Sequence, residues 1–399
     1  MDFELSKDQR LFRDNLQRYL AQHYAFEQRR AIVRSPAGWS REVWAGLAEL
    51  GLLGLEIPEE DGGIGGTAVE MLVTMTAFGR ALAVEPFLPS AVLATRLVRE
   101  LGSPEQRRAL LPALAAGDRI AVPAHGEAEA RYALTHVATT ATPLGRTGSR
   151  GDDGRGGYLL SGRKAVVLHA SAADHLLVSA RSTGAVHDAA GISLFVVDPR
   201  GPGVSMVEYP TFDGQRAADV ILQEVRVAPS DRLGAEGAAG AAIAAAWDVG
   251  VAALCAEAVG ALDAVLAATV DYAKTRKQFG VPIGTFQALQ HDLADMLIHV
   301  EQARSMSYLA AMRARHPDPA VRGVEVSAAK VVVGRACRHV AQAAVQLHGG
   351  MGMTDELAIS HYFRRLTAID LSLGDTDHHL ERFIRAGGAP AVMGAGGTA

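Results

Sequence analysis

Residues Arg276 to Gln290 read Arg-Lys-Gln-Phe-Gly-Val-Pro-Ile-Gly-Thr-Phe-Gln-Ala-Leu-Gln, and this stretch joins two long apolar segments of helical period. It begins with two cations, continues with Phe279, and turns at Gly280 and Pro282. Long helices joined by short connections make an antiparallel bundle. We therefore expect a helical bundle in the second half of the chain, with this connection at one end of it.

The connection carries side chains that suit a nucleotide diphosphate. Arg276 has the planar guanidinium that binds phosphate. Phe279 offers an aromatic face to a base, and Gln278 and Gln287 offer amides to ribose or adenine edges. A cation at the end of a helix can also serve only the helix dipole, and this interpretation is equally good for Lys277.

A second Gly-rich stretch, Gln346-Leu-His-Gly-Gly-Met-Gly-Met-Thr354, follows a further long helical pattern. Glycines have no side chain, so a ligand can approach their backbone closely. This stretch is therefore a second candidate for ligand binding.

The composition is that of a globular protein with a large core, since 49% of the 399 residues are hydrophobic and 21% are charged. This length exceeds one ordinary domain, so two or three packed units are expected. The formal net charge of -5 provides no general attraction to nucleic acid or to anionic membranes. Any phosphate recognition must therefore be local.

The two cysteines, Cys255 and Cys337, lie in apolar helical patterns and indicate neither a disulfide framework nor a metal site. The N-terminal residues are charged and lack the apolar core of a signal peptide, so we expect a cytoplasmic protein. Residues 238–268 are rich in alanine, but Trp247 and three acidic residues interrupt them. We expect a buried bundle helix there and no membrane span, because a span needs roughly 20 apolar residues.

The residue pattern changes twice along the chain. Residues 1–119 indicate helices, the first of them starting at a capping-box pattern from Ser6 to Gln9. Residues 120–236 have the period-two pattern of a β domain, and residues 237–387 are helical again. The expected strands are Tyr158–Gly162, Lys164–His169, His175–Ala180, Ile192–Val197 and Asp219–Leu222. We also expect a mobile hairpin loop at 148–157 and a flexible tail at 388–399.

Three runs together resemble the signature of the FAD-dependent acyl-CoA dehydrogenase family: Arg276 to Gly280, Phe286 to Met296, and Gln346 to Gly350. The domain order is similar through Ala386. The resemblance implies the α+β fold of that family, with an N-terminal helical domain, a middle antiparallel β-barrel-like domain and a C-terminal four-helix bundle.

The resemblance also implies FAD between the middle domain and the bundle, with its adenine and diphosphate reaching a neighbouring subunit. Arg276 would pair with the diphosphate. The other residues implied to contact the cofactor are Gln278, Phe279, Gln287, Gln346, Gly349, Gly350 and Thr376, with the run from Gln346 to Gly350 coming from another protomer. A homo- or heterotetramer and an electron-transfer flavoprotein as electron acceptor are expected with it, and no metal.

The implied reaction is α,β-dehydrogenation of an acyl-CoA thioester, in which a carboxylate removes the Cα proton and the Cβ hydrogen passes as hydride to flavin N5. Many members carry this base as Glu in a Tyr-Glu-Gly-Thr motif, where this chain reads Leu373-Gly-Asp-Thr-Asp-His-His-Leu380. Aligning the following helix puts Asp375 at the base position, whereas aligning the threonines puts Gly374 there. Asp375 is the candidate base, and a helix-capping role for it, or a base on another residue or a partner chain, is the alternative.

The middle domain departs from the family pattern. A flavin-binding run similar to Thr-Glu-Pro-Gly-Ala-Gly-Ser-Asp is replaced by Ala124-His-Gly-Glu-Ala-Glu-Ala-Arg-Tyr132, and the usual Trp-Ile-Thr flavin wall is Val166-Val-Leu168. These features, and the Leu373 to Leu380 run, resemble the small subunit of pimeloyl-CoA dehydrogenase and similar heteromeric bacterial enzymes. A second hypothesis is therefore a subunit that completes the FAD site of a second acyl-CoA dehydrogenase chain without catalysing the reaction itself.

Overall fold

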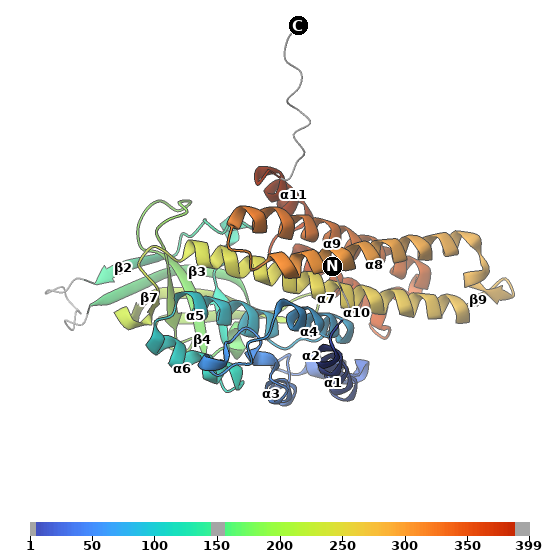
Figure 1. Cartoon of the computed structure of the whole chain (residues 1–399), viewed down its shortest axis with the longest axis horizontal. Helices are drawn as coiled ribbons and strands as arrows, with labels where there is room; N and C mark the ends of the chain where they lie inside the picture. Colours follow the sequence, from blue (N-terminus) through green and yellow to red (C-terminus); the bar gives the residue numbers. More distant parts are fainter. Residues whose placement is uncertain (1–4, 145–155, 388–399) are drawn as a thin grey trace, which may run out of the picture. The chain divides into compact units, whose positions relative to one another are not determined.

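The computed structural model describes residues 5–144 and 156–387 (Figure 1). These residues fall into two compact units. The first unit holds the chain up to Thr74 and residues Ala83–Gly250, and the second holds Met75–Leu82 and the chain from Val251 onward. Most of the expected loop at 148–157 and all of the expected tail at 388–399 lie outside the described residues.

Short helices form the N-terminal part of the first unit. The first helix begins at the expected capping box, in which Ser6 Oγ accepts a hydrogen bond from the Gln9 N–H at 3.2 Å and the Gln9 side chain accepts one from Ser6 N–H at 3.0 Å. The helices are α1 (Lys7–His23), α2 (Phe26–Arg34), α3 (Arg41–Glu49), α4 (Ala68–Ala81), the π-helix η3 (Phe87–Ala94), α5 (Thr95–Leu101) and α6 (Pro104–Ala115).

The β strands of the first unit form one mixed sheet. They are β1 (Ala121–Ala124), β2 (Thr140–Leu144), β3 (Gly157–Leu168), β4 (His175–Arg181), β5 (Ile192–Val197), β6 (Val204–Pro210), β7 (Arg216–Val227) and β8 (Arg232–Leu233). Their order is β6-β7-β3-β2-β4-β5-β8, with β1 beside β4. The pairings are antiparallel except that β1 and β2 each join β4 in parallel.

Apolar side chains from helices and strands share one core in the first unit. Leu97 of α5 and Leu111 of α6 pack with Leu177 of β4, Leu194 of β5 and Ile243, and all five side chains are almost fully buried. Burial of such side chains stabilises each by roughly 1.5 to 3 kcal/mol relative to exposure. The helices α5 and α6 are therefore held on the sheet by hydrophobic packing.

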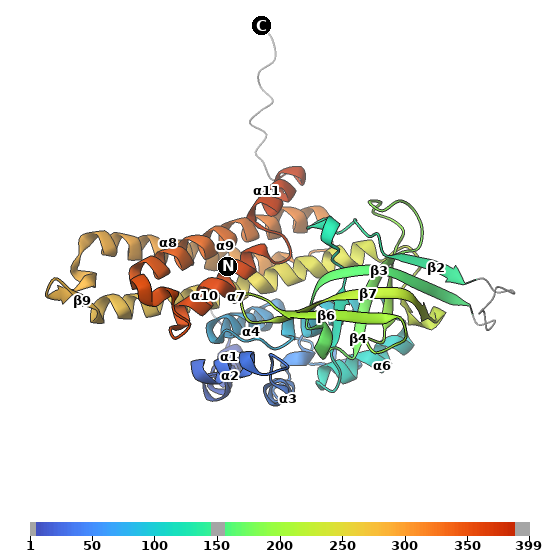
Figure 2. The same cartoon turned by 180° about the vertical axis from the view of Figure 1, so that it is seen from behind.

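Long helices form the second unit, and α8 and α9 run side by side along it (Figures 1 and 2). Both α10 and α11 pack against α9. The elements are the end of α7 (Gly240–Thr275), the hairpin strands β9 (Lys277–Gln278) and β10 (Val281–Pro282), η7 (Ile283–Thr285), α8 (Gln287–Arg313), α9 (Pro319–His348), η8 (Gly349–Met353), α10 (Ala358–Leu371) and α11 (Thr376–Arg385). The expected fold class is thus confirmed: helices, then a β-sheet domain, then a helical domain.

Helix α7 is the one described helix that is long and apolar enough to cross a membrane by length and composition. Within its most apolar window, 83% of the residues are buried inside the structure. A core helix of a soluble domain meets the same criterion, so the burial favours a packing role for α7.

Candidate functional site

The connection between α7 and α8 folds as a tight hairpin, in which β9 pairs antiparallel with β10. Phe279 and Gly280 form its turn with φ of 54° and 85°, and positive φ at both central residues is what such turns require. This conformation is strained for an aromatic residue, and the Phe279 side chain is 92% exposed. A strained aromatic side chain in solvent indicates contact with a ligand or partner.

The polar residues predicted to bind a nucleotide surround this turn. Arg276, Gln278 and Gln287 are all exposed. The Arg276 backbone is fixed, because its N–H donates to the Tyr272 carbonyl and its carbonyl accepts from the Ile283 N–H, both at 2.8 Å. Among the described residues the Arg276 side chain has no ion-pair partner, so its guanidinium can bind an external anion.

The second Gly-rich stretch follows the end of α9. Gly349 has φ of 60°, and a Cβ added at Gly349 or Gly350 would meet no atom within 4 Å, so their backbone is open to a ligand. Gln346 is exposed beside them. The Tyr272 ring stacks on the His348 ring at a centroid distance of 4.3 Å, and the Tyr272 hydroxyl donates to the His348 carbonyl at 3.4 Å.

This contact brings two distant segments together. Tyr272 lies one helical turn before Arg276, and His348 directly precedes the two glycines. Both predicted nucleotide-binding runs therefore occupy the same end of one bundle in one chain.

The turn from α10 to α11 carries the candidate base and the last predicted cofactor residue. Asp375 is the N-cap of α11, and its Oδ1 accepts a hydrogen bond from the His378 N–H at 2.8 Å. Thr376 is buried, and its hydroxyl donates to Asp370 Oδ1 at 2.7 Å. The helix-capping alternative for Asp375 is thus present in the structure, and the Thr376 hydroxyl is already engaged within the chain.

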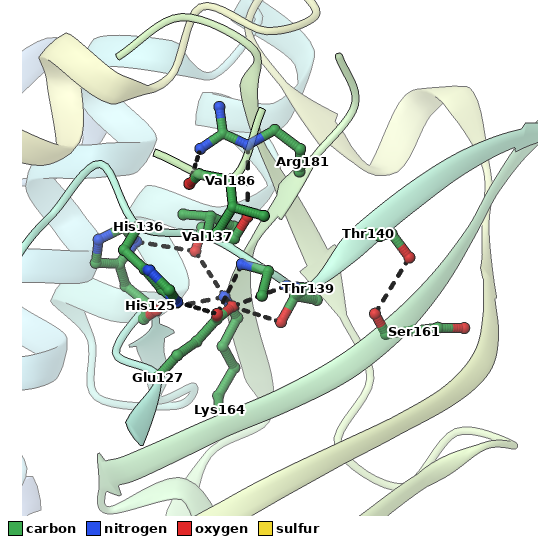
Figure 3. A network of polar contacts seen from close by, with 12 residues as sticks. His125, Glu127, His136, Val137, Thr139, Thr140, Ser161, Lys164, Arg181 and Val186 are labelled. Carbon is green, nitrogen blue, oxygen red and sulfur yellow. Dashed lines mark hydrogen bonds and ion pairs between the residues drawn. The ribbon is translucent and has the colours of Figure 1, made fainter. Parts of the chain in front are cut away.

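His125 and Glu127, which belong to the run that replaces the flavin-binding motif, are part of a buried polar network (Figure 3). Glu127 and Lys164 form an ion pair of 2.8 Å, and both side chains are almost fully buried. Thr139 donates its N–H and its hydroxyl to the Glu127 carboxylate at 3.0 and 2.7 Å. Lys164 Nζ donates further to Ser179 Oγ at 3.1 Å and to the His125 carbonyl at 3.3 Å.

Glu127 and Lys164 each stabilise the charged form of the other. Burial raises the pKa of Glu127, but Lys164 and the Thr139 hydrogen bonds outweigh burial and lower the pKa to about 2. Burial lowers the pKa of Lys164 to about 8, against the opposing effect of Glu127. The pair is therefore ionised at neutral pH, and these polar groups are occupied within the chain.

Val166, the first residue of the segment predicted as the flavin wall, lies at an irregularity of β3. The pairing with β7 shifts between Lys164 and Val167, and Val166 has φ of 51°, which is an outlier for a β-branched residue. Its N–H donates to Asp219 Oδ1 at 3.1 Å, and the same carboxylate accepts from the Tyr209 hydroxyl at 2.8 Å. The bulge leaves the Val166 side chain 58% exposed.

Sequence reasoning missed three residues that hold these turns. Asp219, which accepts from the Val166 N–H, is predicted only as part of a strand, and Asp370, which accepts from the Thr376 hydroxyl, only as part of a helix. Lys330, whose ammonium donates to the Gly374 carbonyl at 2.8 Å, is not among the predicted residues. One signal was available for Lys330: it lies three residues after Ser327 and four before Gly334, so it shares their face of α9. A lysine on an otherwise buried helix face indicates a specific partner.

Models of one protein family match most of the chain. They are the acyl-CoA dehydrogenase N-terminal domain over residues 6–118, the middle domain over 128–226 and the C-terminal domain over 240–387. Acyl-CoA dehydrogenase FadE12 of Mycobacterium tuberculosis is 30% identical over 357 residues, which cover 84% of this chain and 89% of the relative. A caffeyl-CoA reductase-Etf complex subunit, CarC of Acetobacterium woodii, is 29% identical over 83% of this chain and 86% of the relative.

Solved structures give the same similarity. A variant of the Tcur3481-Tcur3483 steroid ACAD has a TM-score of 0.82 and 31% identity, covering 96% of this chain and 98% of that chain. The ChsE4-ChsE5 complex from Mycobacterium tuberculosis has a TM-score of 0.83 and 26% identity, with 98% and 100% covered. PigA with FAD and proline has a TM-score of 0.87 and 25% identity, with 97% and 99% covered.

Proposed function

Because this chain belongs to the acyl-CoA dehydrogenase family, we propose that it binds FAD and catalyses α,β-dehydrogenation of an acyl-CoA thioester. The observation that carries the proposal is the exposed end of the bundle, which presents Arg276, Phe279 and the open Gly349–Gly350 backbone to the outside. On the family pattern, the Gln346–Gly350 run reaches each nucleotide from another protomer, so neighbouring chains would complete the site together. These groups fit the adenosine diphosphate part of FAD.

Each group at this end has a role in holding the cofactor. The Arg276 guanidinium would pair with the diphosphate, the Phe279 ring would offer its face to the adenine, and the amides of Gln278 and Gln287 would bind ribose or adenine edges. The backbone at Gly349 and Gly350 permits close approach, with Gln346 beside it. When bound, FAD supplies the flavin that accepts hydride in this chemistry.

Asp375 is the proposed base for the Cα proton. A carboxylate has two oxygens, so Oδ1 can keep the capping bond from His378 while Oδ2 takes the proton. The side chain is half-buried, which provides part of the shielding that a general base needs. The adjacent Thr376 hydroxyl, held by Asp370, would contact the cofactor through its oxygen lone pairs.

Specific observations favour a second candidate, a subunit that completes the FAD site of a different acyl-CoA dehydrogenase chain, as in the heteromeric bacterial enzymes similar to pimeloyl-CoA dehydrogenase. Asp375 is engaged in capping, and Glu127 and Lys164 are occupied by each other. Two of the similar structures are named as pairs of different chains. We propose further that the chain forms a homo- or heterotetramer, passes its electrons to an electron-transfer flavoprotein and is located in the cytoplasm.

The test is the FAD content and flavin bleaching of the chain purified alone. We expect one FAD per protomer that an acyl-CoA panel reduces. Asp375→Asn should keep its FAD and lose turnover by the roughly 10² to 10⁴-fold that a general base contributes. Arg276→Ala should lose FAD on dilution, whereas Lys274→Ala, which removes an exposed cation two residues earlier, should retain it.

Full turnover by Asp375→Asn would contradict its assignment as the base. A colourless chain that gains FAD only with a second acyl-CoA dehydrogenase chain would contradict the self-sufficient enzyme and support the second candidate.

A further inference from the structure

Lys330 is a fully buried lysine at the centre of α9. Its ammonium donates three hydrogen bonds, to the carbonyls of Ile369, Asp370 and Gly374, each at 2.8 Å. A lysine has three N–H donors, so all of them are used on backbone oxygens. Burying an ammonium is costly unless it is hydrogen-bonded in this way, which indicates a specific task for this side chain.

The three carbonyls lie on both sides of one turn. Ile369 and Asp370 are in the last turn of α10, where carbonyls lack partners within the helix and the dipole is negative. Gly374 directly precedes Asp375, the N-cap of α11. Lys330 therefore ties the end of one helix to the start of the next.

The backbone between these contacts is strained. Leu373 has φ of 56° and Gly374 has φ of 108°, and a left-handed leucine persists only where the surroundings hold it. His379 Nε2 lies 3.1 Å from the Leu373 carbonyl, and Lys330 holds the next carbonyl along the chain. Two consecutive carbonyls of the strained segment are thus fixed from outside the turn.

We propose that Lys330 is a positioning residue for the site. Its ammonium holds the Leu373–Gly374 backbone in the conformation that places the Asp375 carboxylate and the Thr376 hydroxyl where they act. Without the ammonium, the strained turn relaxes and both groups move. The inference rests on the proposed function for the role of Asp375, but the effect on the turn can be measured without any activity.

The test compares the full-length chain with Lys330→Met, which keeps the length of the side chain and removes its donors. Hydrogen–deuterium exchange of residues 371–380 should become at least roughly tenfold faster, because charge-assisted hydrogen bonds are lost there. In the FAD-loaded protein, kcat should fall by roughly 10²-fold, as for a misplacement of about 1 Å, with little change in KM.

Arg304→Met is the matched control. This half-buried cation of α8 bonds Asp263 and Glu301 and does not touch the turn. If Lys330 only stabilises the fold, Lys330→Met should speed exchange over the whole second unit, in the same way as Arg304→Met. That result would overturn the proposal. Unchanged exchange at 371–380, or faster exchange there with unchanged kcat, would overturn it as well. If the wild-type chain has no turnover, the proposed function fails and the exchange pattern alone decides on Lys330.

Discussion

His125 is a buried histidine whose neutral form the fold requires. Its Nδ1 lies 2.8 Å from Ser179 Oγ, and its ring meets the Trp247 ring at a centroid distance of 5.2 Å. Burial, with Lys164 adding to it, lowers the pKa of His125 to about 3. The unfolded chain binds a proton at this residue below roughly pH 6.5, whereas the folded chain does not until about pH 3.

This difference makes folding depend on pH. Between about pH 6.5 and pH 3 the unfolded state binds more protons than the folded state. Lowering the pH in this range therefore decreases the free energy of unfolding, by up to about 1.4 kcal/mol per pH unit for this one residue. When the pH is lowered from 7 to 5, we expect the free energy of unfolding of His125→Gln to decrease by about 2 kcal/mol less than that of the wild type. Calorimetric unfolding at both pH values measures this.

His379→Gln is a comparison in the second unit, because burial also lowers the pKa of His379 to about 3. It should reduce the pH dependence by a similar amount. Parallel curves for wild type and His125→Gln would contradict the prediction.

Sequence reasoning at this scale found exposed residues better than buried ones. Arg276 and Phe279 stand out because their residue types are unusual in a helix connection, and the structure exposes both. Lys330 and Asp219 act through backbone groups distant in sequence, Gly374 and Val166. Such partners depend on how helices and strands pack, which no local pattern encodes.

At the scale of elements, the end of α4 and helix α7 pack backbone to backbone in the second unit. A Cβ at Gly79 would lie 1.8 Å from the Glu257 carbonyl oxygen, and a Cβ at Gly260 would lie 1.8 Å from the Thr76 carbonyl oxygen. Gly79→Ala should therefore destabilise the fold by about 1 to 3 kcal/mol, as overpacking does. The higher helix propensity of alanine, worth about 1 kcal/mol, does not offset this.

Gly323 of α9 is the matched control. A Cβ there would meet its nearest neighbour, Ala386 Cβ, at 3.6 Å, an ordinary contact. Gly323→Ala should therefore stabilise the chain by about 0.5 to 1 kcal/mol. Urea unfolding of both variants checks the opposite signs, and a stabilised Gly79→Ala would show that the two helices can separate without cost.

Helices and strands can be predicted from the sequence where a periodic pattern extends over many residues. The helices of the second unit follow the 3.6-residue pattern, and α1 begins at its expected capping box. The segments 158–162 and 164–169 are expected as two strands but form one, β3, because pairing with β7 continues through Gly162, Arg163 and Lys164. Strand β6 was not expected, since its edge position leaves it mostly exposed and without a buried face.

At the scale of the whole molecule, the domain order could be predicted because the resemblance covers nearly the whole chain. The division into compact units could not, since it cuts through α4 and α7. A helix that belongs to both units has one continuous hydrophobic period. Its sequence therefore does not show where the helix leaves one unit and enters the other.

The second unit also exposes apolar side chains that a lone chain would leave in water. On the surface formed by the hairpin and the first half of α8, the exposed residues are Phe279, Val281, Phe286, Leu297 and Ile298. Leu297 and Ile298 are 49% and 53% exposed on a regular helix. Grouped exposure of this kind marks a protein interface, so we expect the chain to associate with further copies through this surface.

Replacing both Leu297 and Ile298 with Glu should convert the assembly into smaller species, because an interface of identical patches would then bring carboxylates together without partners. Sedimentation velocity of the FAD-loaded chain gives the masses. Leu11→Glu, at a residue 59% exposed on α1 of the first unit, is the control and should leave the mass unchanged. A wild-type chain that sediments as a monomer, or a double variant that keeps the wild-type mass, would show that this surface has another use. An unchanged mass with reduced FAD content would assign the surface to the cofactor, since the surface includes Phe279, and Gln287 directly follows Phe286.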